Sequence, residues 1–220
     1  MAKAKKKVGK SSSVKKQWFK IHAPKLFNEQ VIGEAYLAEI ANGIGRQVPV
    51  NMMNLTGDMK RQNITIMFKT NNATANKLMT EVIGYQIQPS SIKRMVKRGK
   101  NKVDFSFSAV TSDGIKVQIK TILVTLRATN LSYLTSLRNV LKENLTRTLA
   151  KMKYEVFVSD LVNHKIQSIL KNQLKKIFPL RTCEIRYMKV TGKGKPPVLK
   201  EPKKKVVKEE APKKAEEKKE

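Results

Sequence analysis

The segment 103–119, VDFSFSAVTSDGIKVQI, carries the clearest structural signal in this sequence of 220 residues. On both sides of Asp113-Gly114, apolar residues alternate with polar ones, a pattern typical of strands that bury one face. Asp-Gly favours a tight reverse turn, because both residue types tolerate positive φ. The segment therefore predicts a β-hairpin. After a register break, the second strand is predicted to continue through Ile122, Val124 and Leu126.

Shorter strands are predicted on both sides of this hairpin. Residues 18–21 and 48–53 are apolar enough for strands, and Pro49 predicts an edge or a bulge because proline lacks an amide donor. Residues 64–68 alternate in the same way, after a turn at 55–58. The last strand, 182–190, is predicted to place Cys183, Ile185 and Tyr187 on one face and Glu184, Arg186 and Met188 on the other.

Helices are predicted after residue 130, where the apolar period changes from two to 3.6. A second apolar stripe spans 162–177, where Asn163-His164-Lys165 predicts a break into two helices. A short basic helix is predicted from Ser90 to Arg98, stopped by Gly99. Strands followed by helices predict an α+β fold. The main helical stripe lies within an arc of about 120° and consists of Leu131, Leu134, Leu137, Leu141, Leu145, Leu149 and Met152.

The charge is strongly basic and is not confined to the ends of the chain. Of the net +29, residues 1–20 carry +8 and residues 192–220 carry +5, which leaves +16 for residues 21–191. A compact body with this excess of positive charge repels itself, so a polyanion is expected to compensate it. Nucleic acid is the commonest such partner, and an anionic membrane surface is the competing one.

The sequence divides into three segments. Residues 1–17 form a basic N-terminal arm with a serine run at 11–13, and residues 192–220 form a Lys/Glu/Pro-rich tail. Both segments have too few apolar residues to offset the entropy of ordering, so both are expected to be disordered in isolation. Residues 18–191 are the predicted globular core, which is long enough to fold without disulfides or metals.

No catalytic or cofactor chemistry is indicated. The single cysteine, Cys183, excludes a disulfide framework within the chain, and with His22 and His164 it lacks the spacing of metal ligands. No apolar run is long enough for a membrane span or a signal peptide. The sequence therefore predicts a cytoplasmic non-enzyme with no cofactor, metal site or small-molecule substrate.

The segment 92–102 holds six basic residues and no acid. On the predicted helix, Lys93, Arg94, Lys97 and Arg98 share one face, while Ile92, Met95 and Val96 point inward. Solvated helix faces usually interleave acids, so this face favours clamping of phosphates. A second basic cluster lies around a helix end. RNA binding and stabilisation of the helix C-terminus through its dipole explain this cluster equally well. It comprises Lys171, Lys175, Lys176 and Arg181.

Three aromatic residues in predicted strands have two possible roles. Trp18, Phe19 and Tyr187 could stack on unpaired bases. For single aromatics in apolar strands, packing in the core is the favoured role.

The order of several motifs resembles a known family. WFKIHAPKLFN (18–28), IGE (32–34), LTGD (55–58) and KKIFPLRTCEIR (175–186), with GR, DG and RA pairs at 45–46, 113–114 and 127–128, are similar to the small-subunit ribosomal protein family eS-one (formerly S-three-A-e) of archaea and eukaryotes. The short length and the lysine-rich arm favour an archaeal member. Pro49, Met52 and Asn54 depart from the family pattern, so no role is carried over for the acids usual there.

The resemblance implies a structural ribosomal protein that acts in translation. It implies a mostly antiparallel, β-barrel-like core with packed C-terminal helices, located on the small-subunit platform near the mRNA exit side. The implied partners are small-subunit rRNA, neighbouring ribosomal proteins and mRNA near the exit site, with no membrane. The competing hypothesis is a basic protein bound to DNA or to a membrane surface outside the ribosome. From charge and resemblance together, the candidate rRNA-binding residues are Lys5, Lys6, Lys7, Lys10, Lys15, Lys16, Trp18, Arg46, Lys93, Arg94, Lys97, Arg98, Lys100, Lys102, Arg127, Arg138, Lys175, Lys176, Arg181 and Arg186.

Overall fold

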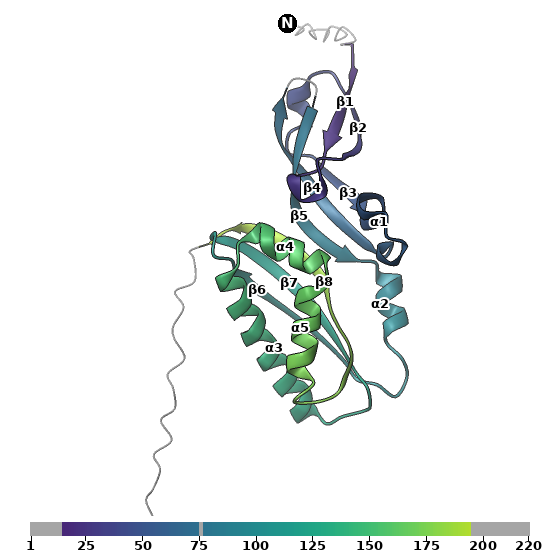
Figure 1. Cartoon of the computed structure of the whole chain (residues 1–220), viewed down its shortest axis with the longest axis vertical. Helices are drawn as coiled ribbons and strands as arrows, with labels where there is room; N and C mark the ends of the chain where they lie inside the picture. The colour runs from purple at the N-terminus through teal and green to yellow at the C-terminus, as the bar shows by residue number, and fades with distance from the viewer. Residues whose placement is uncertain (1–14, 75–76, 195–220) are drawn as a thin grey trace, which may run out of the picture.

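The predicted hairpin forms strands β6 and β7 in a computed structural model, which describes residues 15–74 and 77–194 (Figure 1). The other strands join it in one sheet, and the helices follow the order that the sequence indicates. The strands are β1 (Gln17–His22), β2 (Val31–Leu37), β3 (Gln47–Asn51), β4 (Ile64–Thr74), β5 (Lys77–Ile87), β6 (Lys102–Val110), β7 (Ile115–Thr125) and β8 (Leu180–Lys193). The helices are α1 (Met52–Thr56), α2 (Pro89–Met95), α3 (Leu131–Lys151), α4 (Tyr154–Val162) and α5 (Lys165–Leu174), with short 3-10 turns at Lys25–Phe27, Ile40–Gly43 and Met59–Arg61.

The β6–β7 hairpin is confirmed, with Gly114 in the turn at φ 72°. The predicted register break is wrong for this pair, because pairing runs from Lys102↔Val124 to Val110↔Lys116 without a shift. Ile122 and Leu123 point to opposite faces and are both buried. The apolar residues run together at Ile122, Leu123 and Val124 because both faces of β7 are buried at this end of the strand.

The sheet is open, so the expected barrel-like core is wrong. Its strand order is β2-β1-β5-β8-β7-β6. The long strand β5 pairs with β1 near its start and with β8 near its end, and β4 pairs along the opposite edge of β5, with β3 beyond β4. All pairs are antiparallel except β1–β5, as the mostly antiparallel expectation requires. Helices α3, α4 and α5 lie across one face of β6, β7 and β8 (Figure 1). Because these helices bury the apolar face, the sheet does not need to close on itself.

Helix α3 buries the predicted leucine stripe. Its leucines from 134 to 149 are at most 8% exposed, whereas Leu131 is 80% exposed, because it begins the helix beyond the edge of the core. The predicted break in the next helix is confirmed: α4 ends at Val162, and His164 adopts φ 56° before α5. Together with the sheet, these helices form the main core of an α+β protein.

The face assignment of the last strand is wrong beyond Ile185. β8 pairs with β7 as predicted, but the register shifts between Thr121↔Ile185 and Lys120↔Tyr187. The extra residue at the shift is Arg186, which moves Met188 into the core and leaves Tyr187 half-buried on the other face. The strand continues to Lys193, so Gly192 and Lys193 at the start of the predicted tail are in the sheet. Residues 195–220 of the tail and residues 1–14 of the arm lie outside the described residues.

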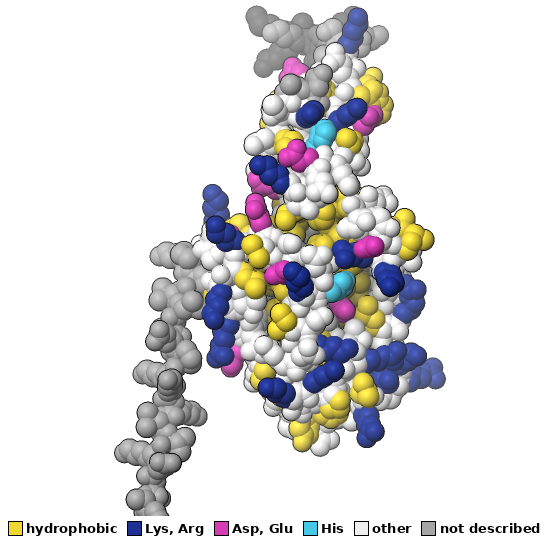
Figure 2. All heavy atoms as spheres, viewed as in Figure 1, with side chains coloured by type: hydrophobic (Ala, Val, Ile, Leu, Met, Phe, Trp, Pro, Cys, Tyr) yellow, Lys and Arg dark blue, Asp and Glu magenta, His cyan; other side chains and the backbone are white. Residues whose placement is uncertain are grey.

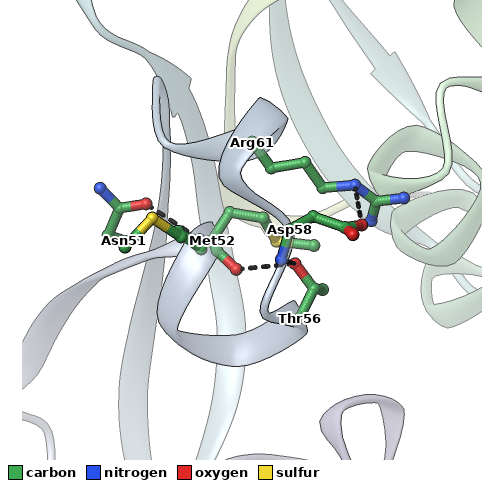
Figure 3. A network of polar contacts seen from close by, with 6 residues as sticks. Asn51, Met52, Thr56, Asp58 and Arg61 are labelled. Carbon is green, nitrogen blue, oxygen red and sulfur yellow. Dashed lines mark hydrogen bonds and ion pairs between the residues drawn. The ribbon is translucent and has the colours of Figure 1, made fainter.

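The region around the predicted 55–58 turn contains a short helix. β3 ends at Asn51, two residues before the predicted strand end, and its side-chain oxygen accepts a hydrogen bond from Met53 N (3.0 Å) at the start of α1 (Figure 3). Thr56 Oγ1 donates to the Met52 carbonyl (3.0 Å), and an Asp58–Arg61 ion pair (3.2 Å) follows. Within the described residues, β3 pairs with β4 alone, which agrees with the edge position that Pro49 predicts.

Asp113 of the hairpin turn also holds a helix that is distant in sequence. Its carboxylate Oδ2 accepts a hydrogen bond from Tyr154 N (2.8 Å), the first amide of α4. The first amides of a helix lack partners within the helix, and a carboxylate there also interacts favourably with the helix dipole. We expect Asp113→Ala to lower the free energy of unfolding by about 1 kcal/mol in urea denaturation.

The neighbouring residue supplies the control for this prediction. Ser112→Ala changes an exposed side chain of the same turn that makes no hydrogen bond within the described residues, so its effect should stay within about 0.5 kcal/mol. Equal losses from the two variants would show that the turn, rather than the bond to Tyr154, sets the effect.

Candidate nucleic-acid interface

Three connections meet at one end of the sheet. They are residues 96–101 before β6, residues 126–130 after β7 and residues 175–179 before β8. Backbone hydrogen bonds join them: Thr125 N donates to the Asn101 carbonyl (3.0 Å), and Leu126 N donates to the Pro179 carbonyl (3.1 Å). The Asn101 side chain donates to the Thr129 carbonyl (2.9 Å). Antiparallel pairing thus brings together loops that are far apart in the sequence.

These connections carry basic side chains and no acid. Figure 2 shows Lys and Arg side chains gathered at this end of the molecule. Because none of the three connections contains a carboxylate, their positive charges act on the same region of solvent, and a polyanion placed there releases counterions from each neutralised phosphate. We call this surface the basic end and define it by Lys97, Arg98, Lys100, Arg127, Lys175, Lys176 and Arg181, of which Lys100 and Arg181 are half-buried and the others exposed.

Helix α2 is shorter than predicted. It begins at Pro89, with Gln88 as the N-cap, and ends at Met95, because Val96 is extended (φ −86°, ψ 119°). The chain must turn here to bring Asn101 beside Thr125. Lys97 and Arg98 are therefore in the loop and do not share a helix face with Lys93 and Arg94, as the sequence had predicted.

Lys93 and Arg94 extend the basic surface along α2. Both are exposed, and Arg94 Nη2 donates to Asn63 Oδ1 (3.1 Å). This bond fixes one edge of the guanidinium, and its other donors remain for a second acceptor. Arg138, also exposed, lies two turns into α3 from the basic end.

Lys102 and Arg186 differ from the other candidates because both face Asp104. Lys102 Nζ lies 2.6 Å from Asp104 Oδ2, and Arg186 Nη1 lies 3.9 Å from Asp104 Oδ1. The carboxylate offsets part of their charge, so they contribute less to the field of the basic end than the seven residues that define it, for which the described part of the chain contains no ion pair.

The remaining described candidates lie away from the basic end. Lys15, Lys16 and Trp18 are exposed at the start of β1, and Arg46 is exposed near the start of β3, where its Nε donates to the Asn42 carbonyl (3.1 Å). The structure therefore separates the predicted set into two groups. Lys5, Lys6, Lys7 and Lys10 lie outside the described residues.

The preference for core packing holds for one of the three aromatics. Phe19 is buried, as that role requires. Trp18 is 65% exposed, because alternation places neighbours on opposite faces of β1. Tyr187 is half-buried, and Lys120 Nζ lies 5.0 Å from its ring centroid.

A lysine-bearing face was missed in the sequence analysis. Lys116 and Lys120 alternate with buried Val117 and Ile119, so they lie on the face of β7 opposite α3. The register places Lys189 beside Gln118 on the same face. The polar positions of the hairpin contained this signal, but the sequence analysis used only the apolar ones.

The side chains of the basic end are hydrogen-bond donors that suit anions. Within residues 15–74 and 77–194, no three His, Cys, Asp or Glu side chains are placed to hold a metal ion. Cys183 is buried in β8, and burial raises the pKa of its thiol from 9.0 to about 12, with a smaller contribution from the Glu184 carboxylate. A thiol with so high a pKa is a poor nucleophile at neutral pH.

We expect Cys183 to react at least about 1,000-fold more slowly with a thiol reagent in the folded protein than in denaturant, because three pKa units reduce the thiolate a thousandfold. The same shift disfavours ionisation in the folded state, so stability should fall as pH rises from 9.0 toward 12. The reaction rate is measured with a thiol reagent that releases a chromophore, from the rise in absorbance. Since Cys183 is the only cysteine, Cys183→Ser is the blank. Equal rates in buffer and denaturant would contradict the burial.

The structure defines an α+β protein with an open sheet, helices on one face and a basic end whose three connections contain no acid. The sequence model of the Ribosomal S3Ae family matches residues 3–194. The chain belongs to this family, which confirms the resemblance seen in its motifs.

Curated relatives cover most of the chain. It is 30% identical to the small ribosomal subunit protein eS1 of Methanothermobacter thermautotrophicus over 185 residues, 84% of this chain and 95% of the relative. It is 27% identical to the protein of the same name from Saccharolobus islandicus over 175 residues, 80% of this chain and 84% of the relative. These relatives are archaeal, as the arm and length predict. None of the described helices is long and apolar enough to cross a membrane.

Proposed function

We propose that this chain is a structural component of the small ribosomal subunit, and hence of the cytoplasm, that binds small-subunit rRNA in translation. The observation that carries the proposal is the basic end, where three connections distant in sequence present basic side chains without an acid. The named relatives, two small ribosomal subunit proteins, support the identity of the particle. The protein acts without catalysis, as the ribosomal family supports.

The basic end binds by charge and shape. Lysines at the loop tips, such as Lys97 and Lys176, act as mobile point charges that follow a phosphate backbone. Arg98, Arg127 and Arg181 add planar donors that can take one phosphate with two hydrogen bonds. Such contacts set the register of the protein on a folded RNA without reading its sequence, which is the role of a structural ribosomal protein.

A finer location follows from the family resemblance. We place the protein on the platform of the small subunit, near the exit side for mRNA, with neighbouring ribosomal proteins around it. In this position the two groups of basic residues face different segments of rRNA. Crosslinking of assembled subunits, followed by sequencing of the attached RNA, tests this location; crosslinks confined to RNA outside the platform would contradict it.

The primary experiment is a sucrose gradient of cell lysate, probed for this protein, at ordinary magnesium and at magnesium low enough to dissociate the subunits. We expect the protein to sediment with the small subunit in both gradients. A position with chromatin or with membrane would instead support the hypothesis of a basic DNA- or membrane-bound protein. A position at the top of both gradients would show that the protein is in no stable complex with the small subunit, with chromatin or with membrane.

A further inference from the structure

Two exposed aromatic side chains lie against each other on the β1–β2 hairpin. Trp18 and Tyr36 are opposite one another in the strand register, and their ring centroids are 4.9 Å apart with an interplanar angle of 37°. Trp18 is 65% exposed and Tyr36 is 52% exposed. Lys16 Nζ lies 5.7 Å from the Tyr36 ring centroid. We call Trp18 and Tyr36 the aromatic pair.

Strand alternation keeps the aromatic pair out of the core. The other face of the same hairpin carries Phe19, Ile21 and Leu37, which form a small core with Leu78 of β5. That face already anchors the hairpin to the sheet, so the aromatic pair is not needed to hold it. Two adjoining rings in water leave apolar area exposed that a flat ligand would cover.

The charges around the aromatic pair select the ligand. Lys15, Lys16 and Lys20 are exposed beside it, and the one acid across the register from Lys20 is Glu34. A flat group attached to phosphates satisfies both features: a base stacks on the indole while an ammonium takes the adjacent phosphate. In Figure 1 the β1–β2 hairpin lies far from the loops of the basic end, so a ligand here is a separate contact.

We propose that the aromatic pair stacks an unpaired base of single-stranded RNA, with Lys16 contacting the phosphate beside it. This inference rests on the proposed RNA-binding function and adds a second contact of a different kind. The basic end holds phosphates of folded RNA, whereas the aromatic pair recognises a base that is free to leave its helix. A duplex buries the faces of its bases, so it offers nothing for the pair to stack on.

Trp18 reports on its own site, because it is the only tryptophan of the chain. We expect a short single-stranded RNA to quench tryptophan fluorescence on binding. Duplex RNA and inorganic polyphosphate should bind, as followed by anisotropy or by competition, without comparable quenching. Bound single-stranded RNA that leaves the fluorescence unchanged would overturn the aromatic contact and leave the proposed function standing. Failure of every RNA to bind would overturn the proposed function itself.

Variants test whether stacking contributes to affinity. Trp18→Ala and Tyr36→Ala should each weaken single-stranded RNA binding by about 5- to 150-fold, the range for loss of one stacked base, and leave duplex binding unchanged. Trp18→Phe should retain most of the affinity, since it keeps a ring. The matched control is Val156→Ala, a half-exposed apolar residue on α4. Equal losses for duplex and single strand, or unchanged RNA affinity with loss of a neighbouring ribosomal protein, would overturn the inference.

Discussion

Alanine at Lys97, Arg98, Lys175 and Lys176 together is expected to weaken binding to folded small-subunit rRNA by about 100- to 1,000-fold near physiological salt. Each lost phosphate contact also removes the release of about 0.7–0.9 counterion. For the four contacts together, the plot of log affinity against log salt concentration should therefore become less steep by about 3. Filter binding or anisotropy over a salt series measures both quantities. All four side chains are exposed, so the thermal midpoint of unfolding should change little.

The control removes the same charges elsewhere. Alanine at Arg147, Lys151, Lys153 and Lys165 also deletes one arginine and three lysines, all exposed, around the far end of α3 and the helices that follow it. If the four charges acted only through long-range attraction, both variants would lose the same RNA affinity. A selective loss in the first variant assigns the phosphate contacts to the basic end, and equal losses would refute that assignment.

The second large effect concerns stability. Leu141 is fully buried in the middle of α3, where this helix packs on the sheet. Leu141→Ala should lower the free energy of unfolding by about 2–5 kcal/mol, because it removes buried area and leaves a cavity that the core refills only in part. That is a large fraction of the about 5–15 kcal/mol that holds a typical domain together. Urea denaturation measures the change.

Leu131 supplies the matched control on the same helix. It is 80% exposed, so Leu131→Ala should change the free energy of unfolding by no more than about 0.5 kcal/mol. The two leucines belong to the same predicted stripe, and only the structure separates them. Similar effects from the two substitutions would mean that α3 does not pack as described.

The elements predicted correctly are those with a strong local pattern. The hairpin of β6 and β7 and the leucine stripe of α3 each bury one face with a constant period, and periodicity is readable without knowing the partner. The strand β5 was missed. Its inward positions include Thr80 and Gly84, which interrupt the apolar pattern. Both have roles that depend on distant strands: Thr80 donates a hydrogen bond to the His22 carbonyl (2.7 Å), and Gly84 lies close to the Met188 carbonyl.

For the candidate RNA-binding residues too, the sequence predicted local properties but not those that depend on distant strands. Residue type was enough to select Lys97, Arg127 and Lys176 as candidates, since a positive charge needs no fold to be counted. Their grouping could not be predicted, because it depends on the pairing of β6, β7 and β8 across more than 70 residues of chain. The face of Trp18 was also open, since both alternating sets of β1 contain an aromatic ring.

The sequence by itself determined the α+β class, the period of each strongly patterned element, the basic charge and the family. These properties depend on local periodicity, on composition and on the order of motifs along the chain. Only the tertiary structure decided that the sheet stays open, that three basic loops meet at one end and that Trp18 faces solvent beside Tyr36. Each of these depends on which strands pair and in what register, and that is settled by long-range burial that no local pattern encodes.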